Sequence, residues 1–351
     1  MKRFSRRDFL RFMMLSAGSL TVNRVLTACG LRPTPGLSSD IPALFSPTNT
    51  ALASQTTSVP STEASPGDGA SAPSVTGTPL SPVDLVVAHG SDPDGMARQA
   101  LAAFGGMQTF VPKGATVVVK PNICVAYHTY EYAATTNPWL VGALVKLAFE
   151  AGAGRVQVFD FPFGGSAQEG YVRSGIEEQV KAAGGEMLPM PDFKFLPTDI
   201  PNGRDLKNTR AFKDALDADV LIDVPIAKHH GSARLTLGMK NLMGLVLDRG
   251  AIHNNLGQRI ADLATLFRPT LTVVDAIRIL MRHGPSGGNL DDVKKMDTII
   301  VSPDIVAADS YATTLFGLQP FDIDYITAAS NMKLGNSDLS SLKIEEINVG
   351  A

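Results

Sequence analysis

The fold of this chain is constrained most by an alternation of short β-branched runs with helical segments. Residues 115–120 read Ala-Thr-Val-Val-Val-Lys and follow a Pro-Lys-Gly turn, and residues 155–160 form a second such run. Between them, Asn137 precedes a proline and apolar residues at helical spacing, which predicts a helix of about fourteen residues capped by Asn137. Strand, helix and strand in this order predict a βαβ unit with parallel strands and a right-handed crossover.

The same alternation continues toward the C-terminus. We predict further strands at 219–226, 271–275 and 298–301, and further helices near 168–183, 233–247, 256–266 and 304–316. This order is typical of an α/β domain. We therefore expect residues 83–351 to form one domain with a mostly parallel, doubly wound, Rossmann-like sheet that carries helices on both faces.

Four of the predicted strands end on charged residues. These are Lys120, Asp160, the run Lys228-His229-His230, and Asp275. The carboxyl ends of parallel strands lie on one edge of the sheet, where open α/β folds bind their ligands. A single polar residue in such a place often marks only the end of the core. Four strands that do so together indicate a binding site at this rim.

The segment after the histidines adds a possible anion site. Gly231 and Ser232 predict a turn and a helix N-cap, so the free amides of a following helix would lie beside Lys228 and His229. Such amides suit a carboxylate or a phosphate. Lys240 follows Thr236 by one helical turn and could point along the same groove. The alternative is that Lys240 and Asn241 lie on an ordinary solvated helix face.

A divalent metal is the second interpretation of the histidines. His229 and His230 are adjacent, so their side chains face opposite ways on a strand and only one can reach a given ion. A site would need His230 together with His253 and a carboxylate such as Asp275 or Asp160. No local spacing brings these residues together, so an anion site is preferred over a metal at His230 and His253.

The N-terminal residues predict an export signal. Residues 1–29 join a basic head that contains Arg6 and Arg7 to a modest apolar run, in the layout of a twin-arginine signal read by its translocase. Leu26-Thr-Ala-Cys29 resembles a lipobox, which predicts lipidation of Cys29 and a membrane anchor. Simple cleavage and an uncleaved anchor are the alternatives. Residues 30–82 are rich in Ser, Thr, Pro, Gly and Ala, and predict a disordered tether.

Charge and cysteine content exclude several classes of protein. Residues 1–28 hold six basic residues and one acidic residue, a net charge of +5. Because the whole chain has a net charge of −3, the remaining residues have a net charge of −8. An acidic exported domain is unsuited to binding nucleic acid. Cys29 and Cys124 are the two cysteines of the sequence, which leaves no set of thiolates for an iron–sulfur cluster or a zinc site. Cys124 is expected to be a small buried residue.

Several motifs resemble the domain of unknown function 362 family of prokaryotic proteins. They are VVVKPN at 117–122, VPIAKHH at 224–230, TLGMKNLMG at 236–244, VVDAI at 273–277, HGPSGG at 283–288 and VSPDIVAADSYATTLFG at 301–317. The resemblance implies an α/β domain, often beside ferredoxin-type cysteine motifs, which this chain lacks. The family-like positions that it implies are Lys120, Asn122, Lys228, His230, Lys240, Asn241, Asp275 and Asp309.

Together these features predict an exported enzyme that acts on a small anionic molecule with a carboxylate or a phosphate. His230, Lys228 and Asp275 are the candidate catalytic residues. The candidate substrate-binding residues are Lys120, Asn122, Asp160, His229, Lys240 and Asn241. Two alternatives stay open: a lipoprotein that binds a ligand without turnover, and an accessory protein for the maturation of redox enzymes.

Overall fold

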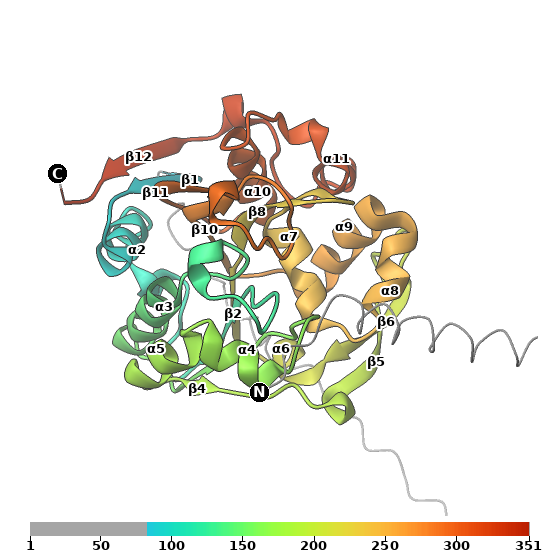
Figure 1. Ribbon diagram of the computed structural model, residues 1–351, viewed down its shortest axis with the longest axis horizontal. Helices are drawn as coiled ribbons and strands as arrows, with labels where there is room; N and C mark the ends of the chain where they lie inside the picture. Colours follow the sequence, from blue (N-terminus) through green and yellow to red (C-terminus); the bar gives the residue numbers. More distant parts are fainter. Residues whose placement is uncertain (1–82, 351) are drawn as a thin grey trace, which may run out of the picture. The chain divides into compact units, whose positions relative to one another are not determined.

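The computed structural model describes residues 83–350 (Figure 1). The predicted leader, Cys29 and the predicted tether lie outside these residues. A ten-stranded sheet runs in the order β12-β1-β11-β10-β7-β2-β3-β4, with β8 paired to β10 and β9 paired to β8. Its strands are β1 (Leu85–His89), β2 (Thr116–Pro121), β3 (Arg155–Val158), β4 (Glu186–Met187), β7 (Val220–Val224), β8 (Ile226–His230), β9 (Arg234–Thr236), β10 (Leu271–Leu280), β11 (Val293–Ser302) and β12 (Ile344–Asn348).

Most pairings in the large sheet are parallel. Strand β2 pairs in parallel with β3 and β7, and β7 pairs in parallel with β10, whereas β11 is antiparallel to both β10 and β1. A separate antiparallel pair is formed by β5 (Phe195–Asp199) and β6 (Asn208–Phe212). The predicted mostly parallel α/β sheet is confirmed, with β11 as an antiparallel insertion.

Helices cover both faces of the sheet (Figure 1). They are α2 (Pro93–Ala102), α3 (Pro138–Glu150), α4 (Ala167–Arg173), α5 (Ile176–Ala182), α6 (Lys213–Leu216), α7 (Gly238–Asn241), α8 (Arg249–Ile252), α9 (Leu256–Phe267), α10 (Ile305–Thr314) and α11 (Asp324–Asn331). Side chains alternate along β2, so Val117 and Val119 pack in the core that holds α2, α3 and α5. Val118 lies in the opposite core with α9, α10 and α11. The two-residue period of a strand thus supplies two cores.

Several helices lie where caps and apolar spacing in the sequence predict them. Helix α3 begins with Pro138, and the side chain of Asn137 accepts hydrogen bonds from the amides of Trp139 at 3.0 Å and Leu140 at 3.3 Å. Helix α9 lies where a helix was expected near 256–266. The helix predicted near 168–183 is two helices, α4 and α5, because Gly175 between them adopts φ +78°. Within residues 83–350, no helix has the length and apolar character needed to cross a bilayer.

The predicted helix near 233–247 is wrong. Gly231 and Ser232 instead form the turn of a hairpin in which β8 pairs with β9. Helix α7 then has four residues and continues into the 3-10 turn η4 (Leu242–Leu245). Strand β8 pairs with β10 on one edge and with β9, which follows the turn, on the other. Pairing in the sheet therefore overrides the helical spacing of the apolar residues.

Asp275 does not end a strand. Strand β10 runs on through Leu280, because residues 278–280 pair with residues 293–295 of β11. Asp275 therefore lies in the middle of a buried strand rather than at the carboxyl rim of the sheet.

Candidate functional site

A pocket of about 410 Å³ lies beyond the carboxyl ends of β2, β3 and β8. Segments far apart in the sequence line it: the loops after β2 and β3, the β8–β9 hairpin, α7 with η4, and α8. The lining residues are Asn122, Ile123, Cys124, Asp160, Phe161, Phe163, Lys228, His230, Thr236, Lys240, Asn241, Met243, Gly244, Arg249, His253 and Pro285. The rim at which the sequence predicted a binding site thus holds a real cavity.

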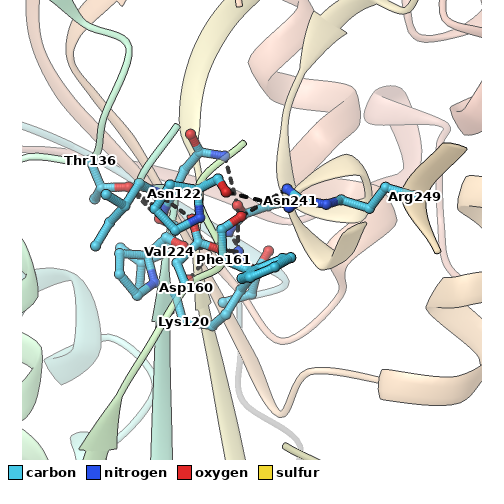
Figure 2. A network of polar contacts seen from close by, with 12 residues as sticks. Lys120, Asn122, Thr136, Asp160, Phe161, Val224, Asn241 and Arg249 are labelled. Carbon is cyan, nitrogen blue, oxygen red and sulfur yellow. Dashed lines mark hydrogen bonds and ion pairs between the residues drawn. The ribbon is translucent and has the colours of Figure 1, made fainter. Parts of the chain in front are cut away.

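A buried ion pair forms the floor of this site (Figure 2). The Nζ of Lys120 donates to Asp160 Oδ1 at 2.8 Å, to Asn241 Oδ1 at 2.8 Å and to the carbonyl of Pro121 at 2.9 Å. The other oxygen of Asp160 accepts from the amide of Ile123 at 2.5 Å. All three hydrogen-bond donors of Lys120 are thus used, and its positive charge balances the negative charge of Asp160. The pair therefore fixes the position of neighbouring residues but adds no net charge to the pocket.

Two asparagines connect this pair to the rest of the site. Asn241 Oδ1 also accepts from Asn122 Nδ2 at 2.9 Å, and Asn241 Nδ2 donates to Asp223 Oδ1 at 2.8 Å. Asn122 Oδ1 in turn accepts from Lys228 Nζ at 2.9 Å. We call these linked residues the Lys120 network: Lys120, Asp160, Asn241, Asn122 and Asp223. The network fixes both amide orientations, since each oxygen faces ammonium or amide donors.

Asp223 was not anticipated from the sequence. It is fully buried on β7, and its Oδ2 has no hydrogen-bond partner among the described residues. Burial raises the pKa of this carboxyl well above its usual value, although Lys120 nearby acts in the opposite direction. A neutral carboxylic acid beside Asn241 is the state that this setting favours.

Glycine 244 explains the end of the motif Lys-Asn-Leu-x-Gly. A Cβ at Gly244 would overlap Asp160 Oδ1 and lie 2.7 Å from Lys120 Nζ. A Cβ at Gly238 would lie 2.8 Å from Asp309 Oδ1. The chain from Gly238 to Gly244 therefore lies directly against buried carboxylates, and any side chain at either glycine would displace them.

The pocket also carries three cations, Lys228, Lys240 and Arg249, which we call the cationic wall. Lys228 Nζ donates to the carbonyl of Ala134 at 2.6 Å, and Arg249 Nη1 donates to the carbonyl of Phe161 at 2.8 Å. The guanidinium also lies 4.6 Å from the centre of the Phe161 ring. None of the three forms an ion pair with a carboxylate within residues 83–350. The pocket therefore has excess positive charge.

Lys240 differs from the other two cations in its contacts. Its side chain is 8% exposed, and the polar contact found for Nζ among the described residues is the thioether of Met243 at 3.7 Å. Burial, followed by repulsion from Lys228, lowers the pKa of Lys240 to about 8. Burial likewise lowers the pKa values of Lys228 and Arg249. A buried ammonium with only a sulfur contact has hydrogen bonds to give to a ligand.

Thr236 supplies an unused hydroxyl. It lies opposite Lys228 in the β8–β9 hairpin, and its Oγ1 is buried with no hydrogen-bond partner among the described residues. Thr236 also lines the pocket. A buried hydroxyl is costly to leave unpaired, so this position too suits a polar ligand.

His230 lies in the pocket and His229 does not. The Nδ1 of His230 accepts from the amides of Ser232 at 3.2 Å and Ala233 at 3.3 Å. Burial, then the charges of Lys240 and Lys228, lowers the pKa of His230 to about 3. A neutral ring with its Nδ1 accepting carries its proton on Nε2, which is a donor. His229 points to the other side of the strand, where its Nδ1 accepts from the amide of Gly284 at 3.1 Å.

The expected helix amides are not free. Asp309 on α10 accepts from the amides of Gly238 at 2.6 Å and Met239 at 2.9 Å, which occupies the start of α7. Burial raises the pKa of Asp309 to about 7. An anion in this pocket would therefore meet side chains rather than helix amides, and the predicted contribution of a helix N-terminus is wrong.

Asp275 is not brought to the pocket. Its Oδ2 accepts from the amide of Asn137 at 2.7 Å and its Oδ1 from that of Ile277 at 3.0 Å. Burial raises the pKa of this carboxyl to about 6. Asp275 fixes the start of α3 against β10, and the structure gives it no place among the groups that could contact a ligand.

Comparison with known proteins identifies the family. A family model described as "Domain of unknown function (DUF362)" matches residues 117–314. The chain belongs to this family. The thylakoid-associated protein sll1697 of Synechocystis is 31% identical over 248 residues, which are 68% of this chain and 74% of that protein.

Two solved structures are weakly similar to this family member. The lactate racemase apoprotein of Thermoanaerobacterium thermosaccharolyticum has a TM-score of 0.42 and 12% identity, with 66% of this chain and 56% of that chain covered. A Thermotoga maritima protein solved by structural genomics has a TM-score of 0.32 and 10% identity, with 69% and 60% covered. The chain thus spans less than two thirds of either structure.

The family motifs coincide with the contacts of the site. VVVKPN supplies Lys120 and Asn122, VPIAKHH supplies Lys228 and His230, and KNLMG supplies Lys240, Asn241 and Gly244. Four contributors were missed at the level of sequence: Asp223, Thr236, Gly244 and Arg249. The glycine in KNLMG was a signal for close packing. Arg249, in a surface-like Asp-Arg-Gly sequence, gave none.

The structure does not assemble the residues proposed for a metal. His230 and His253 both line the pocket, but His253 is exposed and its Nδ1 lies 2.9 Å from the carbonyl of Arg249. Over residues 83–350, no group of three or more His, Cys, Asp or Glu side chains is arranged to hold a metal ion. Asp160, the nearest candidate carboxylate, is bonded to Lys120 and Ile123.

Proposed function

We propose that this protein binds a small molecule carrying a carboxylate or a phosphate in the pocket and acts on it as an enzyme. One observation carries the proposal: the buried Lys240 ammonium faces the pocket with a thioether as its polar contact. The acidic side chain on the pocket wall, Asp160, is already paired with Lys120. An anion would therefore meet uncompensated positive charge in a partly desolvated site, where charge interactions are strong.

Each residue of the cationic wall has a distinct role in this proposal. Lys228 and Arg249 are held in place by backbone carbonyls, so they present fixed charges to the anion. Lys240, whose contact is a thioether, has the most hydrogen bonds left to give to a ligand. His230, neutral and protonated on Nε2, would donate a hydrogen bond rather than remove a proton. The candidate catalytic residue His230 therefore acts in the proposal as a hydrogen-bond donor.

Titration calorimetry with the full chain tests binding. Phosphate, pyruvate and lactate are the probes, and glycerol is the neutral comparison. We expect at least one anion to bind with a one-to-one ratio, and Lys240→Met to weaken it at least tenfold. Lys146→Met removes an exposed lysine and is the matched control. Absence of binding for all three anions would contradict the proposal.

Turnover separates an enzyme from a binding protein. The bound anion is incubated with the protein and followed by NMR for exchange or conversion. If His230→Ala and Lys228→Ala weaken binding and no reaction is detected with any bound anion, the protein binds a ligand without turnover and is not an enzyme.

We also propose that the chain is exported by the twin-arginine route and anchored through a lipid on Cys29. The twin-arginine-like residues and the lipobox-like Leu26-Thr-Ala-Cys29 support this, and the relative from Synechocystis is named as thylakoid-associated. Cell fractionation tests it. Cys29→Ala should release the protein from the membrane fraction, and replacing Arg6 and Arg7 by lysine should keep it inside the cell.

A further inference from the structure

Lys240 has the surroundings of a reactive amine as well as those of a charge. It sits on α7, buried to 8% exposure, between Lys228 and Arg249 on the cationic wall, and its Nζ contacts Met243 Sδ at 3.7 Å. Lys120, by contrast, is locked by three oxygen acceptors. Of these two buried lysines, only Lys240 has a nitrogen that a ligand could reach and bond.

We propose that Lys240 forms an imine with a small carbonyl compound that also carries an anionic group, so that the pocket acts by covalent catalysis. The inference rests on the proposed function, because it requires the cationic wall to hold the anionic group. A carboxylate next to the carbonyl, as in a 2-oxo acid, and a phosphate one or two atoms away are the two forms of this chemistry. The pocket volume of about 410 Å³ accommodates a molecule of either kind.

The neighbours of Lys240 have different roles in such a reaction. Arg249, held by the carbonyl of Phe161, and Lys228, held by Asn122 and Ala134, would bind the anionic group and orient the carbonyl. Thr236 lines the same pocket with a buried hydroxyl that has no partner among the described residues. That hydroxyl can relay a proton to the carbonyl oxygen. His230 can hydrogen-bond the same oxygen through Nε2.

The covalent step needs no further reactant. The lone pair of the neutral Lys240 amine adds to the carbonyl carbon as the C=O π bond breaks. The oxygen takes up one proton and the nitrogen loses one, which gives a neutral carbinolamine. The hydroxyl then takes up a second proton and leaves as water while the nitrogen lone pair forms the C=N bond, and loss of the second nitrogen proton gives the imine. Amine and carbonyl compound thus give imine and one water. The iminium form is stabilised by the anionic group of the substrate itself.

The electrostatics raise the fraction of Lys240 that is a neutral amine at ordinary pH. Burial, and then the charge of Lys228, lowers the pKa of Lys240 to about 8. About one tenth of such amines are neutral at pH 7, against roughly one in three thousand for a lysine of ordinary pKa. A neighbouring cation and a desolvated site are known ways to activate a lysine nucleophile.

Reductive trapping tests the proposal on the full-length protein. Pyruvate and glycolaldehyde phosphate are each added with sodium cyanoborohydride, followed by intact mass measurement and peptide mapping. We expect one equivalent of a stable secondary amine at Lys240 from at least one probe. The probe that traps identifies the carboxylate or the phosphate form. Lys240→Arg keeps a cation and should abolish the single adduct, whereas Lys146→Arg should leave it unchanged.

The outcomes also separate this inference from the proposed function. If calorimetry shows that pyruvate or phosphate binds but no adduct forms at Lys240, the imine is wrong and the anion pocket stands. If adducts spread over exposed lysines with no preference for Lys240, the imine is equally wrong. If neither anion binds, both proposals fail. Peptide mapping locates the adduct in the wild-type protein, so the test remains valid even if Lys240→Arg fails to fold.

Discussion

The Lys120 network and the cationic wall both contribute to one pocket, but their buried lysines have different hydrogen-bond partners. Lys120 gives its three hydrogen bonds to oxygen acceptors and is paired with Asp160. Lys240 is nearly as buried but contacts a thioether. A buried charge without a partner lowers the stability of a folded protein. We therefore propose a structural role for Lys120 and a ligand-binding role for Lys240.

Replacing Lys120 should have the largest effect on stability. Lys120→Met leaves Asp160 buried without its partner, and loss of one member of a buried pair costs about 3–5 kcal/mol. Urea denaturation measures the free energy of unfolding. Lys146→Met, whose side chain is 55% exposed, is the control and should change it by less than about 0.5 kcal/mol. A similar loss in both variants would show that the Lys120–Asp160 pair does not stabilise the fold.

Gly244→Ala should come next, because it attacks the same pair without removing either charge. The new methyl group would overlap Asp160 Oδ1 and crowd Lys120 Nζ. Overpacking of this kind costs about 1–3 kcal/mol. Gly250→Ala is a matched control, since nothing lies within 4 Å of its Cβ position. If the two alanine variants unfold at the same urea concentration, the close approach at Gly244 is not needed for stability.

Lys240→Met should change stability in the opposite direction from Lys120→Met. It removes an uncompensated buried ammonium, so we expect an increase of about 1–2 kcal/mol in the free energy of unfolding at pH 7. The same variant should lose anion binding. A loss of stability instead would mean that Lys240 is a structural lysine like Lys120.

The pH dependence of this difference follows from the lowered pKa of Lys240, which is about 8. The unfolded chain binds its proton up to a pKa of about 10.4, so between these values the unfolded state holds more protons and folding stability rises with pH. The advantage of Lys240→Met over the wild type should therefore be full below pH 8 and shrink as pH rises toward about 10.5. Denaturation curves of both proteins across this range measure it. A constant difference would contradict the lowered pKa.

The smallest expected effect is at His230. Its pKa is lowered to about 3, so the ring should stay neutral at moderately acidic pH. Proton NMR of the full chain, with the signal assigned by comparison with His230→Asn, should show no titration of His230 between about pH 5 and pH 8. A titration with a midpoint near about 6.5 would show that burial and the charges of Lys240 and Lys228 do not hold the ring neutral.

Comparing expectation with structure shows where sequence patterns fail. The pattern around Asn137 placed α3 because its cap, its proline and its apolar spacing are all local. The spacing of Leu235, Met239 and Leu242 also looked helical, but pairing of β8 with β10 and β9 turned residues 234–236 into a strand. Asp275 looked like a strand end because a charge interrupts an apolar run. Its two backbone donors and the pairing with β11 allow the strand to continue.

By itself, the sequence determined the α/β class, the succession of βαβ units and the rim where Lys120, Asp160 and Lys228 meet. These follow from the spacing of apolar residues and from the order of consecutive strands and helices, both of which can be read from short stretches of chain. Only the tertiary structure decided which lysine is paired and which is free. That choice depends on distances between residues more than a hundred positions apart, such as Lys120 and Asn241, and on a glycine that lets two segments touch. Hydrogen bonds between such distant groups leave no period in the sequence from which they could be predicted.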